Sequence, residues 1–577
     1  MGASYGLGQG TPAFSPLVVG VITLVGAVFF ACLAILANIA YDEYLTRPPR
    51  RGRLSRFVPQ WQRRSVVRFS LVMAVFWLPW LIALYPGGAY WDTYYQIQQV
   101  FPENHPVSII PFGDHGKDTV TSAYFCDHHP LFDTLLYGGF AAASQALTGS
   151  WNAGSFAFVI LQAAATIVAL TASVAYLRKL GAPSALCFTA FAFFCVMPFI
   201  STWALTMVKD SLFSLAYIPY FMMLVAAVAT RGRSLERGRS IAPFIGLGVL
   251  LCLTKKTGMY VVIPTALFAC AAILLRIWRA RTLTGSRSYA PRLLAAFGGQ
   301  AVACLLVMTF LLPWVVFPAL DVAPGGRQES LGVALQQTAA FVHEHRDEVT
   351  PEEMAAIDAV IPYGRLIDDY DPLCQDGAKY HFRLDASPQA VHRYLEVWAQ
   401  MGLRHPDTYL GAVFTIGGGY LSPCQPLNIR TTTCDTWQGD VHVLYNPEGL
   451  NWLREGLAAL YDSYASLPVL SLPVQATVWV FWLPALLWLV ARCHHRGSGL
   501  LFVPSAIVLA FCIIGPIFDA RYCLPLLYTV PLMACFVFRR RPAERLQRTE
   551  VPRHDPPKKI ALETSSSTHE ERGCCDG

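Results

Sequence analysis

The sequence predicts an all-α polytopic membrane protein with about eleven transmembrane helices and a mixed extracytoplasmic domain. Two observations predict this class. Of the 577 residues, 54% are hydrophobic and only 14% are charged, a balance too apolar for a soluble globular chain. The apolar residues also gather in runs of about 17 to 25, the length that crosses a bilayer core of about 30 Å.

Eleven apolar runs account for the predicted helices. They lie at 16–40, 69–87, 153–176, 184–203, 207–229, 241–254, 257–275, 293–318, 469–491, 498–517 and 521–538. The first has no basic residues before it and is longer than the apolar core of a signal peptide, which favours a retained span.

Basic residues set the predicted orientation, because Lys and Arg concentrate in cytoplasmic loops. Residues 47–68 contain eight arginines, and further clusters lie at 178–179, 231–239, 276–292, 492–496 and 539–541. Eleven spans place all of them inside. We therefore expect a multi-pass protein of the plasma membrane, with its N terminus outside and its C terminus cytoplasmic. The net charge of +6 then belongs to cytoplasmic loops, and no nucleic-acid partner is expected.

The predicted spans divide the chain into five parts. They are an extra N-terminal span with a basic loop (1–68), a transmembrane core with a first outer loop at 88–152 (69–318), an extracytoplasmic domain (319–468), C-terminal transmembrane helices (469–538) and a disordered cytoplasmic tail (539–577). In the extracytoplasmic domain, the apolar pattern from Leu331 and the Thr350-Pro351 N-cap signal predict helices.

The sequence leaves open whether any of the cysteines form a disulfide. Most of the sixteen lie in spans, where a free thiol is a small apolar side chain. Four are expected outside, namely Cys126, Cys374, Cys424 and Cys434. Cys424 and Cys434 could form a disulfide in an oxidising compartment or remain free.

A candidate catalytic carboxylate opens the first outer loop. Asp92 follows a Pro-Gly-Gly turn and precedes a helical pattern, so it could serve as an N-cap. It could also act as a general base, because a carboxylate in a partly desolvated cleft can take a proton from an acceptor hydroxyl. The neighbouring side chains expected to contact substrate are Trp91, Tyr94, Tyr95 and Gln96.

Asp127, His128 and His129 form a second candidate group. They precede Pro130 and an apolar helix over 131–146, expected to lie along the membrane surface. One interpretation is a helix cap; others are participation in catalysis, binding of a divalent cation together with Asp92, or binding of a phosphate. A divalent cation is therefore an open possibility, and no other cofactor is expected.

Ionisable residues also mark the outer ends of later spans. They are Lys209-Asp210, Lys255-Lys256 and Asp519-Ala520-Arg521-Tyr522. Snorkelling or local ion pairing could explain each of them. The two adjacent lysines, however, fall in a short outer turn, against the positive-inside bias. Lys209, Lys255, Lys256 and Arg521 are the candidate ligands of a phosphate, with Asp210 and Tyr522 as further substrate contacts.

Several of these motifs resemble the GT-C superfamily of integral membrane glycosyltransferases, and specifically an uncharacterised bacterial branch of it. The resemblance covers most of residues 69–538 and rests on the stretch from Tyr85-Pro86-Gly87 to Asp92, His128-His129-Pro130, Lys209-Asp210, Leu331 to Gln337, and Arg521-Tyr522 with Pro525. No WWDYG-like motif is present, which argues against an enzyme that glycosylates asparagine. No DxD motif stands beside Asp92.

The resemblance implies a GT-C-like fold and an inverting transfer of a sugar from a polyprenyl-phosphate carrier, with Asp92 as general base. The acceptor would be a cell-envelope glycan, glycolipid or protein on the extracytoplasmic face. A polymerase or ligase of lipid-linked glycans and a transporter or flippase are the alternatives. A transporter would carry charged or broken helices near the membrane midplane, whereas the ionisable groups here lie at the outer ends of the spans.

Overall fold

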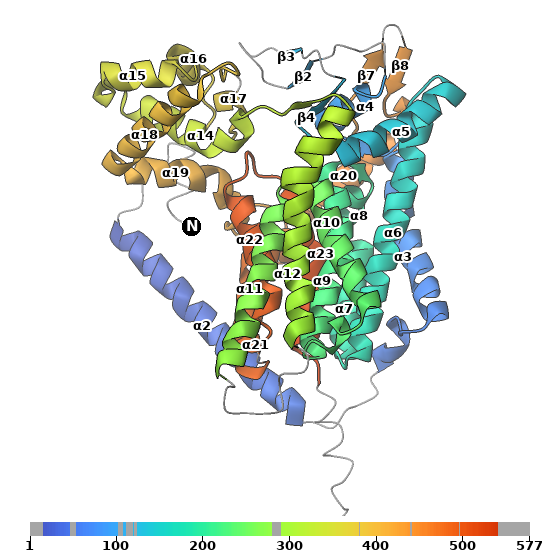
Figure 1. Ribbon diagram of the computed structural model, residues 1–577. Coiled ribbons are helices and arrows are strands. Elements are labelled where there is room, and N and C mark those ends of the chain that lie inside the picture. The colour runs from blue at the N-terminus through green and yellow to red at the C-terminus, as the bar shows by residue number, and fades with distance from the viewer. Residues whose placement is uncertain are drawn as a thin grey trace, which may run out of the picture.

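The computed structural model describes residues 16–46, 53–101, 108–110, 119–120, 124–279, 290–379, 381–438, 441–495 and 497–540. Long helices form a bundle, and a smaller group of helices and short strands lies at one end of it (Figure 1). The predicted disordered tail lies outside the described residues, apart from its first two.

Among the described residues, seven helices are long and apolar enough to cross a membrane. They are α2 (Pro16–Thr46), α3 (Arg63–Ala83), α6 (Asn152–Lys179), α9 (Lys209–Ala229), α11 (Gly258–Arg279), α12 (Ala290–Leu306) continued by η5 (Val307–Val316) and α13 (Phe317–Ala319), and α23 (Ala520–Val537). The predicted class of a helical polytopic membrane protein is therefore confirmed.

The other four predicted spans correspond to bent or shorter helices. α7 (Ser184–Val196) and α8 (Pro198–Ala204) meet at an angle of 60° and would make an eighth span if counted together. The bend lies at Met197, whose extended backbone is what a following proline imposes. The remaining three are α10 (Gly238–Thr254), η10 (Val478–Trp482) with α21 (Leu483–His494), and α22 (Gly499–Ile513). A count of eleven stays a prediction.

The helices differ in how far they are buried. α23 packs against α9, α6 and α7 in the middle of the bundle, and nearly every side chain from Leu524 to Val537 is buried. The described side chains of α2 are mostly exposed, and this helix lies diagonally at the edge of the bundle, against α21 (Figure 1). Exposed apolar faces on such long helices are what a surrounding bilayer requires.

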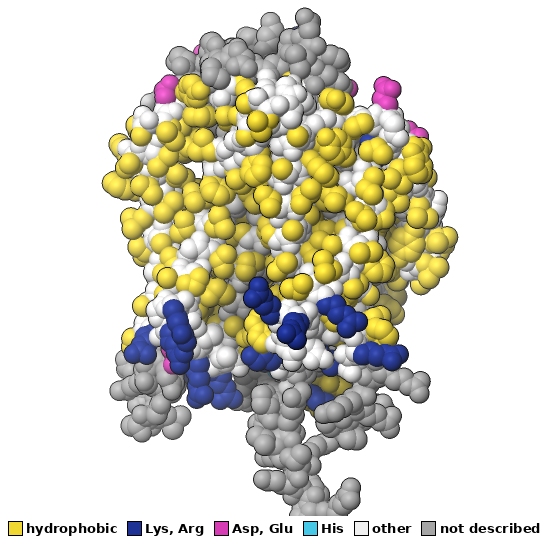
Figure 2. Space-filling model, turned by 90° about the vertical axis from the view of Figure 1, so that its right-hand side faces the viewer, with side chains coloured by type: hydrophobic (Ala, Val, Ile, Leu, Met, Phe, Trp, Pro, Cys, Tyr) yellow, Lys and Arg dark blue, Asp and Glu magenta, His cyan; other side chains and the backbone are white. Residues whose placement is uncertain are grey.

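Charge is distributed unevenly between the two ends of the bundle. Hydrophobic side chains cover its middle, and Lys and Arg form a band near the end opposite the short strands (Figure 2). Basic residues occupy the last turns of α6 and α11.

A separate group of helices, here named the head domain, lies beside the strand end of the bundle (Figure 1). It comprises α14 (Gln328–Glu344), α15 (Pro351–Asp358), α16 (Tyr363–Asp368), α17 (Asp376–Lys379), α18 (Pro388–Arg404) and α19 (Pro406–Gly417). Its own core includes Leu335, Phe341 and Met401. The helix predicted near Leu331 is present, and Thr350 caps α15 in a capping box with Glu353.

Shorter elements connect these parts. The helices are α4 (Trp91–Gln98), α5 (Leu131–Thr148) and α20 (Asn451–Ala465), with 3-10 turns η1 (Arg53–Phe57), η4 (Arg233–Leu235), η6 (Arg346–Glu348), η7 (Gly418–Tyr420), η8 (Glu448–Leu450) and η9 (Leu472–Val474). The strands are β1 (Gly88–Ala89), β2 (Ser108–Ile110), β3 (Thr119–Val120), β4 (Phe125–Asp127), β5 (Thr206–Met207), β6 (Val322–Pro324), β7 (Thr436–Gln438) and β8 (Val441–Leu444).

Of the four strand pairs in the described part of the chain, two hold distant segments together. β1 pairs with β5 in parallel, so that Ala89 lies opposite Met207. β4 pairs in parallel with β6, which ties the residues before His128 to the start of the head domain. The other two pairs, β2 with β3 and β7 with β8, are antiparallel hairpins.

The thiols of Cys424 and Cys434 are free, so the disulfide alternative is wrong in this structure. Cys434 is buried and its thiol donates to the Tyr90 carbonyl oxygen at 3.6 Å. Cys424 is exposed. Cys434 therefore packs against the segment that carries Asp92 and is unavailable to Cys424.

Candidate functional site

Three helices begin at one place, at the strand end of the bundle. They are α4, α9 and α23, and the side chains of Lys209 and Arg521, in the first turns of α9 and α23, both contact Asp92 in the first turn of α4. The first N–H groups of a helix have no partner within the helix, and the helix dipole is positive there. A meeting of three such ends favours carboxylates in the first turns, and it also favours an anionic ligand.

Asp92 lies at the centre of this cluster. Its Oδ2 is 3.1 Å from Nζ of Lys209 and 3.4 Å from Nη1 of Arg521. Its side chain is 29% exposed, so a ligand can reach it. The interpretation of Asp92 as an N-cap is wrong, because α4 begins at Trp91, Tyr90 occupies the cap position, and Asp92 lies within the first turn.

The charges around Asp92 decide its protonation state. Burial alone would raise the pKa of Asp92, but the positive charges led by Lys209, and including Arg521, outweigh burial and hold that pKa well below its usual range. Asp92 is therefore a carboxylate at neutral pH. In this state it can accept a proton, although its two cations make it a weak base.

His129 is the second residue that contacts the ammonium group of Lys209. Nδ1 of His129 lies 3.0 Å from Nζ of Lys209. Burial, helped by the charge of Lys209, holds the pKa of His129 well below its usual value, and burial lowers the pKa of His128 to about 4. Both rings are neutral at pH 7, so Nδ1 of His129 accepts the hydrogen bond from the ammonium group. The Lys209 ammonium group thus lies in the place that a divalent cation between Asp92 and His129 would take.

A second set of ion pairs borders the first. Lys255 pairs with Asp210, and Nζ of Lys256 lies 2.8 Å from Oδ2 of Asp127. Nε of Arg521 lies 4.0 Å from Oδ2 of Asp210. The residues predicted at the outer ends of separate spans are thus brought together. Lys255 and Lys256 reach the site from the turn between α10 and α11.

Aromatic rings and a third carboxylate surround Arg521. Its Nε lies 3.4 Å from Oδ2 of Asp519, which also accepts a hydrogen bond from the Tyr90 hydroxyl at 2.9 Å. The hydroxyl of Tyr522 accepts from Nη2 of Arg521 at 3.0 Å. The Tyr90 ring centre lies 4.4 Å from the guanidinium carbon of Arg521. These contacts fix the orientation of the guanidinium group beside Asp92.

The remaining predicted substrate contacts differ in accessibility. Trp91 is exposed, and Tyr94 packs between Trp91 and Tyr95, with ring centres 5.7 Å apart in both pairs. Gln96 is buried, and its amide donates to Thr134 Oγ1 at 3.2 Å, which holds α4 on α5. Helical spacing places Gln96 one turn beyond Asp92 on the same face, beneath α5. The structure therefore does not support a substrate contact for Gln96.

No local sequence pattern identified two further residues of the site, Arg430 and Asn428. Arg430 donates to the Ala89 carbonyl at 2.8 Å, and its guanidinium carbon lies 4.1 Å from the Tyr90 ring centre. The amide of Asn428 donates to Oδ1 of Asp519 at 3.2 Å. Both lie in a Pro-flanked loop more than 300 residues from Tyr90, and only the tertiary fold brings them together.

Asp133 is a buried carboxyl group behind the site. It lies in the first turn of α5 and is fully buried, and among the described residues neither of its oxygens has a hydrogen-bond partner. Burial raises the pKa of Asp133 well above its usual value. The side chain is therefore held as the neutral acid, the expected response of an unpaired buried carboxyl group.

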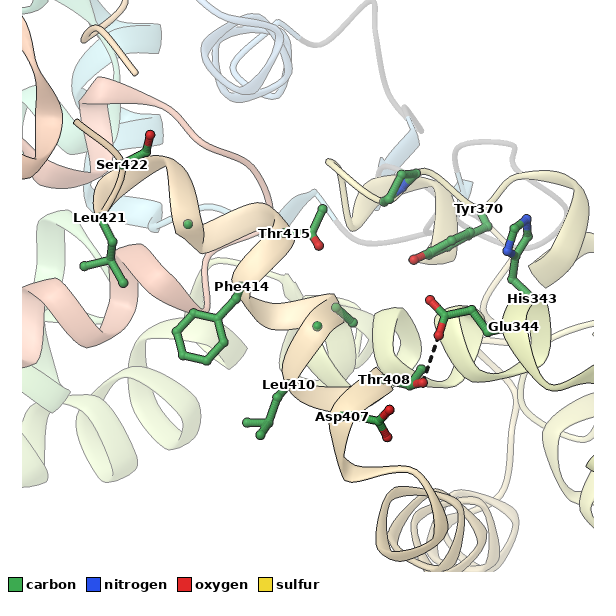
Figure 3. A pocket seen from close by; sticks show the side chains of 14 residues that line it. His343, Glu344, Tyr370, Asp407, Thr408, Leu410, Phe414, Thr415, Leu421 and Ser422 are labelled. Atoms are coloured by element: carbon green, nitrogen blue, oxygen red, sulfur yellow. Dashed lines mark hydrogen bonds between the residues drawn. The ribbon is translucent and has the colours of Figure 1, made fainter. Parts of the chain in front are cut away.

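Two cavities lie near this cluster. One of about 640 Å³ separates the end of α14 from α19 in the head domain (Figure 3). Just beyond its wall, the Tyr420 hydroxyl donates to the Asp519 carbonyl at 2.8 Å. The other, of about 370 Å³, is an apolar groove between α3 and α6 that reaches Leu205. The Leu205 carbonyl accepts from Gly88 N at 3.0 Å, so the groove ends beneath the β1–β5 pair.

The comparisons with known proteins place the chain in a family without naming an activity. No curated protein and no solved structure shows significant similarity to it. The model of one family, described as a family of unknown function (DUF6020), matches residues 41–551. Because this match covers most of its length, the chain belongs to the DUF6020 family.

Proposed function

We propose that this protein is a membrane glycosyltransferase of the GT-C type. It transfers a sugar from a polyprenyl-phosphate carrier to a hydroxyl group of an acceptor on the extracytoplasmic face. One observation carries the proposal. A partly exposed carboxylate, Asp92, shares its Oδ2 atom with Lys209 and Arg521 at the meeting point of three helix N-termini.

The cations are suited to the phosphate of the donor. Four Lys and Arg side chains, those of Lys209, Lys255, Lys256 and Arg521, face the carboxylates of Asp92, Asp127, Asp210 and Asp519. The helix N-termini add further positive potential. Arg521 offers a planar fork of donors that matches phosphate oxygens, and Lys209 a mobile point charge.

Donor binding would also activate Asp92. The phosphate competes for Lys209 and Arg521, and each cation that turns away from Asp92 raises the basicity of its carboxylate. Asp92 then accepts the proton of the acceptor hydroxyl while the hydroxyl oxygen bonds to the anomeric carbon. The bond between that carbon and the phosphate oxygen breaks, and the polyprenyl phosphate leaves with its negative charge stabilised by the cations.

Two features of the surface agree with a lipid-linked donor. The apolar groove between α3 and α6 is lined mainly by aliphatic side chains, together with Trp77 and Ser70, and ends beneath β1 and β5, close to the segment that carries Asp92. It can take part of a polyprenyl chain. The band of Lys and Arg lies at the opposite end of the bundle (Figure 2), and such bands mark the cytoplasmic side, so the site would face outward at the plasma membrane.

The proposal is tested with the full chain in lipid nanodiscs. Radiolabelled polyprenyl-phosphate sugars are incubated with the protein and envelope extracts, and label transfer and donor hydrolysis are measured. Turnover of at least one monosaccharide donor is expected. Activity only with oligosaccharides on lipid pyrophosphate would favour a ligase or polymerase, and donor movement between leaflets without bond cleavage would favour a flippase.

A further inference from the structure

A second group of ionisable side chains lies in the head domain, away from Asp92. His345 follows the end of α14, Glu348 ends η6, and His405 joins α18 to α19. One ligand atom from each lies within 4.8 Å of the others, and no other set of three His, Cys, Asp or Glu side chains does so among the described residues. From this arrangement, we infer that His345, Glu348 and His405 form a binding site for Zn²⁺.

The three side chains lie close together. Nε2 of His405 lies 2.9 Å from Oε2 of Glu348, and Nδ1 of His345 lies 3.6 Å from Oε1 of the same carboxylate. The two imidazole rings stack, with centres 3.7 Å apart. Two imidazoles and one carboxylate are a known zinc ligand set, and imidazole nitrogen selects transition metals over Mg²⁺ and Ca²⁺.

Hydrogen bonds outside the cluster orient His345. The Thr408 hydroxyl donates to Oε2 of Glu344 at 2.8 Å, a bond drawn in Figure 3. Because its only hydrogen is used there, the Thr408 oxygen must accept from Nε2 of His345, which lies 3.0 Å away. Nε2 is thereby engaged by Thr408, and Nδ1 is the nitrogen that faces Glu348. Metal-binding histidines are commonly held in this way, through a hydrogen bond from the nitrogen that does not bind the metal.

The spacing of these groups suits a shared ion. Nδ1 of His345 lies 3.6 Å from Oε1 of Glu348, longer than a direct hydrogen bond. The nearby guanidinium group of Arg404 bonds elsewhere, because its Nη2 pairs with Glu353 at 2.6 Å and its Nη1 donates to the backbone carbonyl of Glu348 at 3.2 Å. A dication bound to both histidines would bridge them to the Glu348 carboxylate.

The site is open on one side. The side chain of Glu348 is 49% exposed, and those of His345 and His405 are 23% and 25% exposed. Zn²⁺ from solvent can therefore enter, and water can supply the fourth ligand. A bound ion would link the end of α14 to the α18–α19 junction. α19 leads through η7 to Tyr420, whose hydroxyl donates to the Asp519 carbonyl. The ion would therefore also stabilise the position of Asp519 in the candidate site.

The test uses the full chain, purified without a histidine tag and stripped with a chelator. Zinc binding is measured by isothermal titration with ZnCl₂ and by metal analysis after dialysis. We expect about one Zn²⁺ per chain, and at least about a tenfold loss of affinity in His405→Gln and Glu348→Gln. His392→Gln is the matched control, because His392 faces Glu396 at 3.4 Å on the surface of the same domain. It should bind zinc as the wild type does.

A second measurement on the wild type needs no substitution. Co²⁺ in place of Zn²⁺ should give the visible absorption of a tetrahedral site, and Zn²⁺ should abolish it. Failure of the stripped wild type to bind either ion at micromolar concentration would overturn the proposal. So would equal zinc affinity in His405→Gln and the wild type, since the cluster would then be a hydrogen-bonded histidine pair and nothing more.

Discussion

The ammonium group of Lys209 lies 3.1 Å from Oδ2 of Asp92, although the two residues are 117 positions apart in the chain. The parallel pairing of β1 with β5 brings them together. Ala89 lies opposite Met207, and α4 and α9 each begin two residues beyond their strand. The Thr93 hydroxyl donates to the Met207 carbonyl, which fixes the first turn of α4 beside the first turn of α9.

This pairing predicts the pH dependence of the proposed sugar transfer. The pKa of Asp92 is depressed, so the carboxylate persists as pH falls, and kcat/KM in the wild type should stay level from pH 7 to about pH 5. Lys209→Gln removes the cation that lowers the pKa most. The acidic limb of the profile should then move to higher pH.

Arg383→Gln, which removes a cation paired with Asp358 in the head domain at 3.5 Å, is the control and should leave the profile unchanged. A wild-type acidic limb near pH 6 would contradict the assigned charge state of Asp92.

Arg521 should determine donor affinity. Its guanidinium group contacts Asp92, Asp519 and Tyr522, a set of directions that an ammonium group cannot reproduce. Arg521→Ala should weaken binding of a radiolabelled polyprenyl-phosphate sugar by about tenfold or more, which is about 1.4 kcal/mol. Arg521→Lys should restore only part of the lost donor affinity. Donor affinity is measured with the protein in nanodiscs, and gel filtration verifies that each variant is folded. Unchanged affinity in Arg521→Ala would exclude a contact between Arg521 and the phosphate.

The sequence was sufficient for features set by local composition. The apolar runs predicted the helices, and the positions of Lys209, Lys255 and Arg521 at the ends of such runs predicted their clustering. The capping box at Thr350 follows from a local pattern and is present.

Features that depend on contacts between distant parts of the chain could not be predicted from the sequence. Arg430 meets Ala89 across 341 positions, and nothing near it in the sequence indicates Tyr90 as its neighbour. Gln96 carries a polar side chain next to the aromatic group, but the packing of α4 on α5 buries it. His405 lies beside His345 because α18 and α19 both pack against α14, so no metal-ligand spacing appears in the sequence.

The buried carboxyl group of Asp133 predicts a stabilising substitution. The folded state raises its pKa, so the folded chain binds a proton that the unfolded chain releases at neutral pH. Stability is therefore lost as pH rises from about 3.9 through the folded pKa. Asp133→Asn removes this penalty, and its unfolding temperature in detergent should exceed that of the wild type at pH 7.

The gain should disappear below about pH 3, where both states of the wild type are protonated. Asp385→Asn, an exposed carboxylate of the head domain, should show no gain at either pH. A lower unfolding temperature for Asp133→Asn at pH 7 would mean that Asp133 is ionised and paired in the folded protein.

The most direct test of the account is sugar transfer by Asp92→Asn in nanodiscs, beside the wild type and Asp385→Asn. Asparagine keeps the size of the side chain but cannot take a proton. We expect transfer to fall by at least about a hundredfold, the usual contribution of a general base, with donor binding retained and Asp385→Asn fully active. Turnover by Asp92→Asn at the wild-type rate would contradict the assignment of Asp92 as the base.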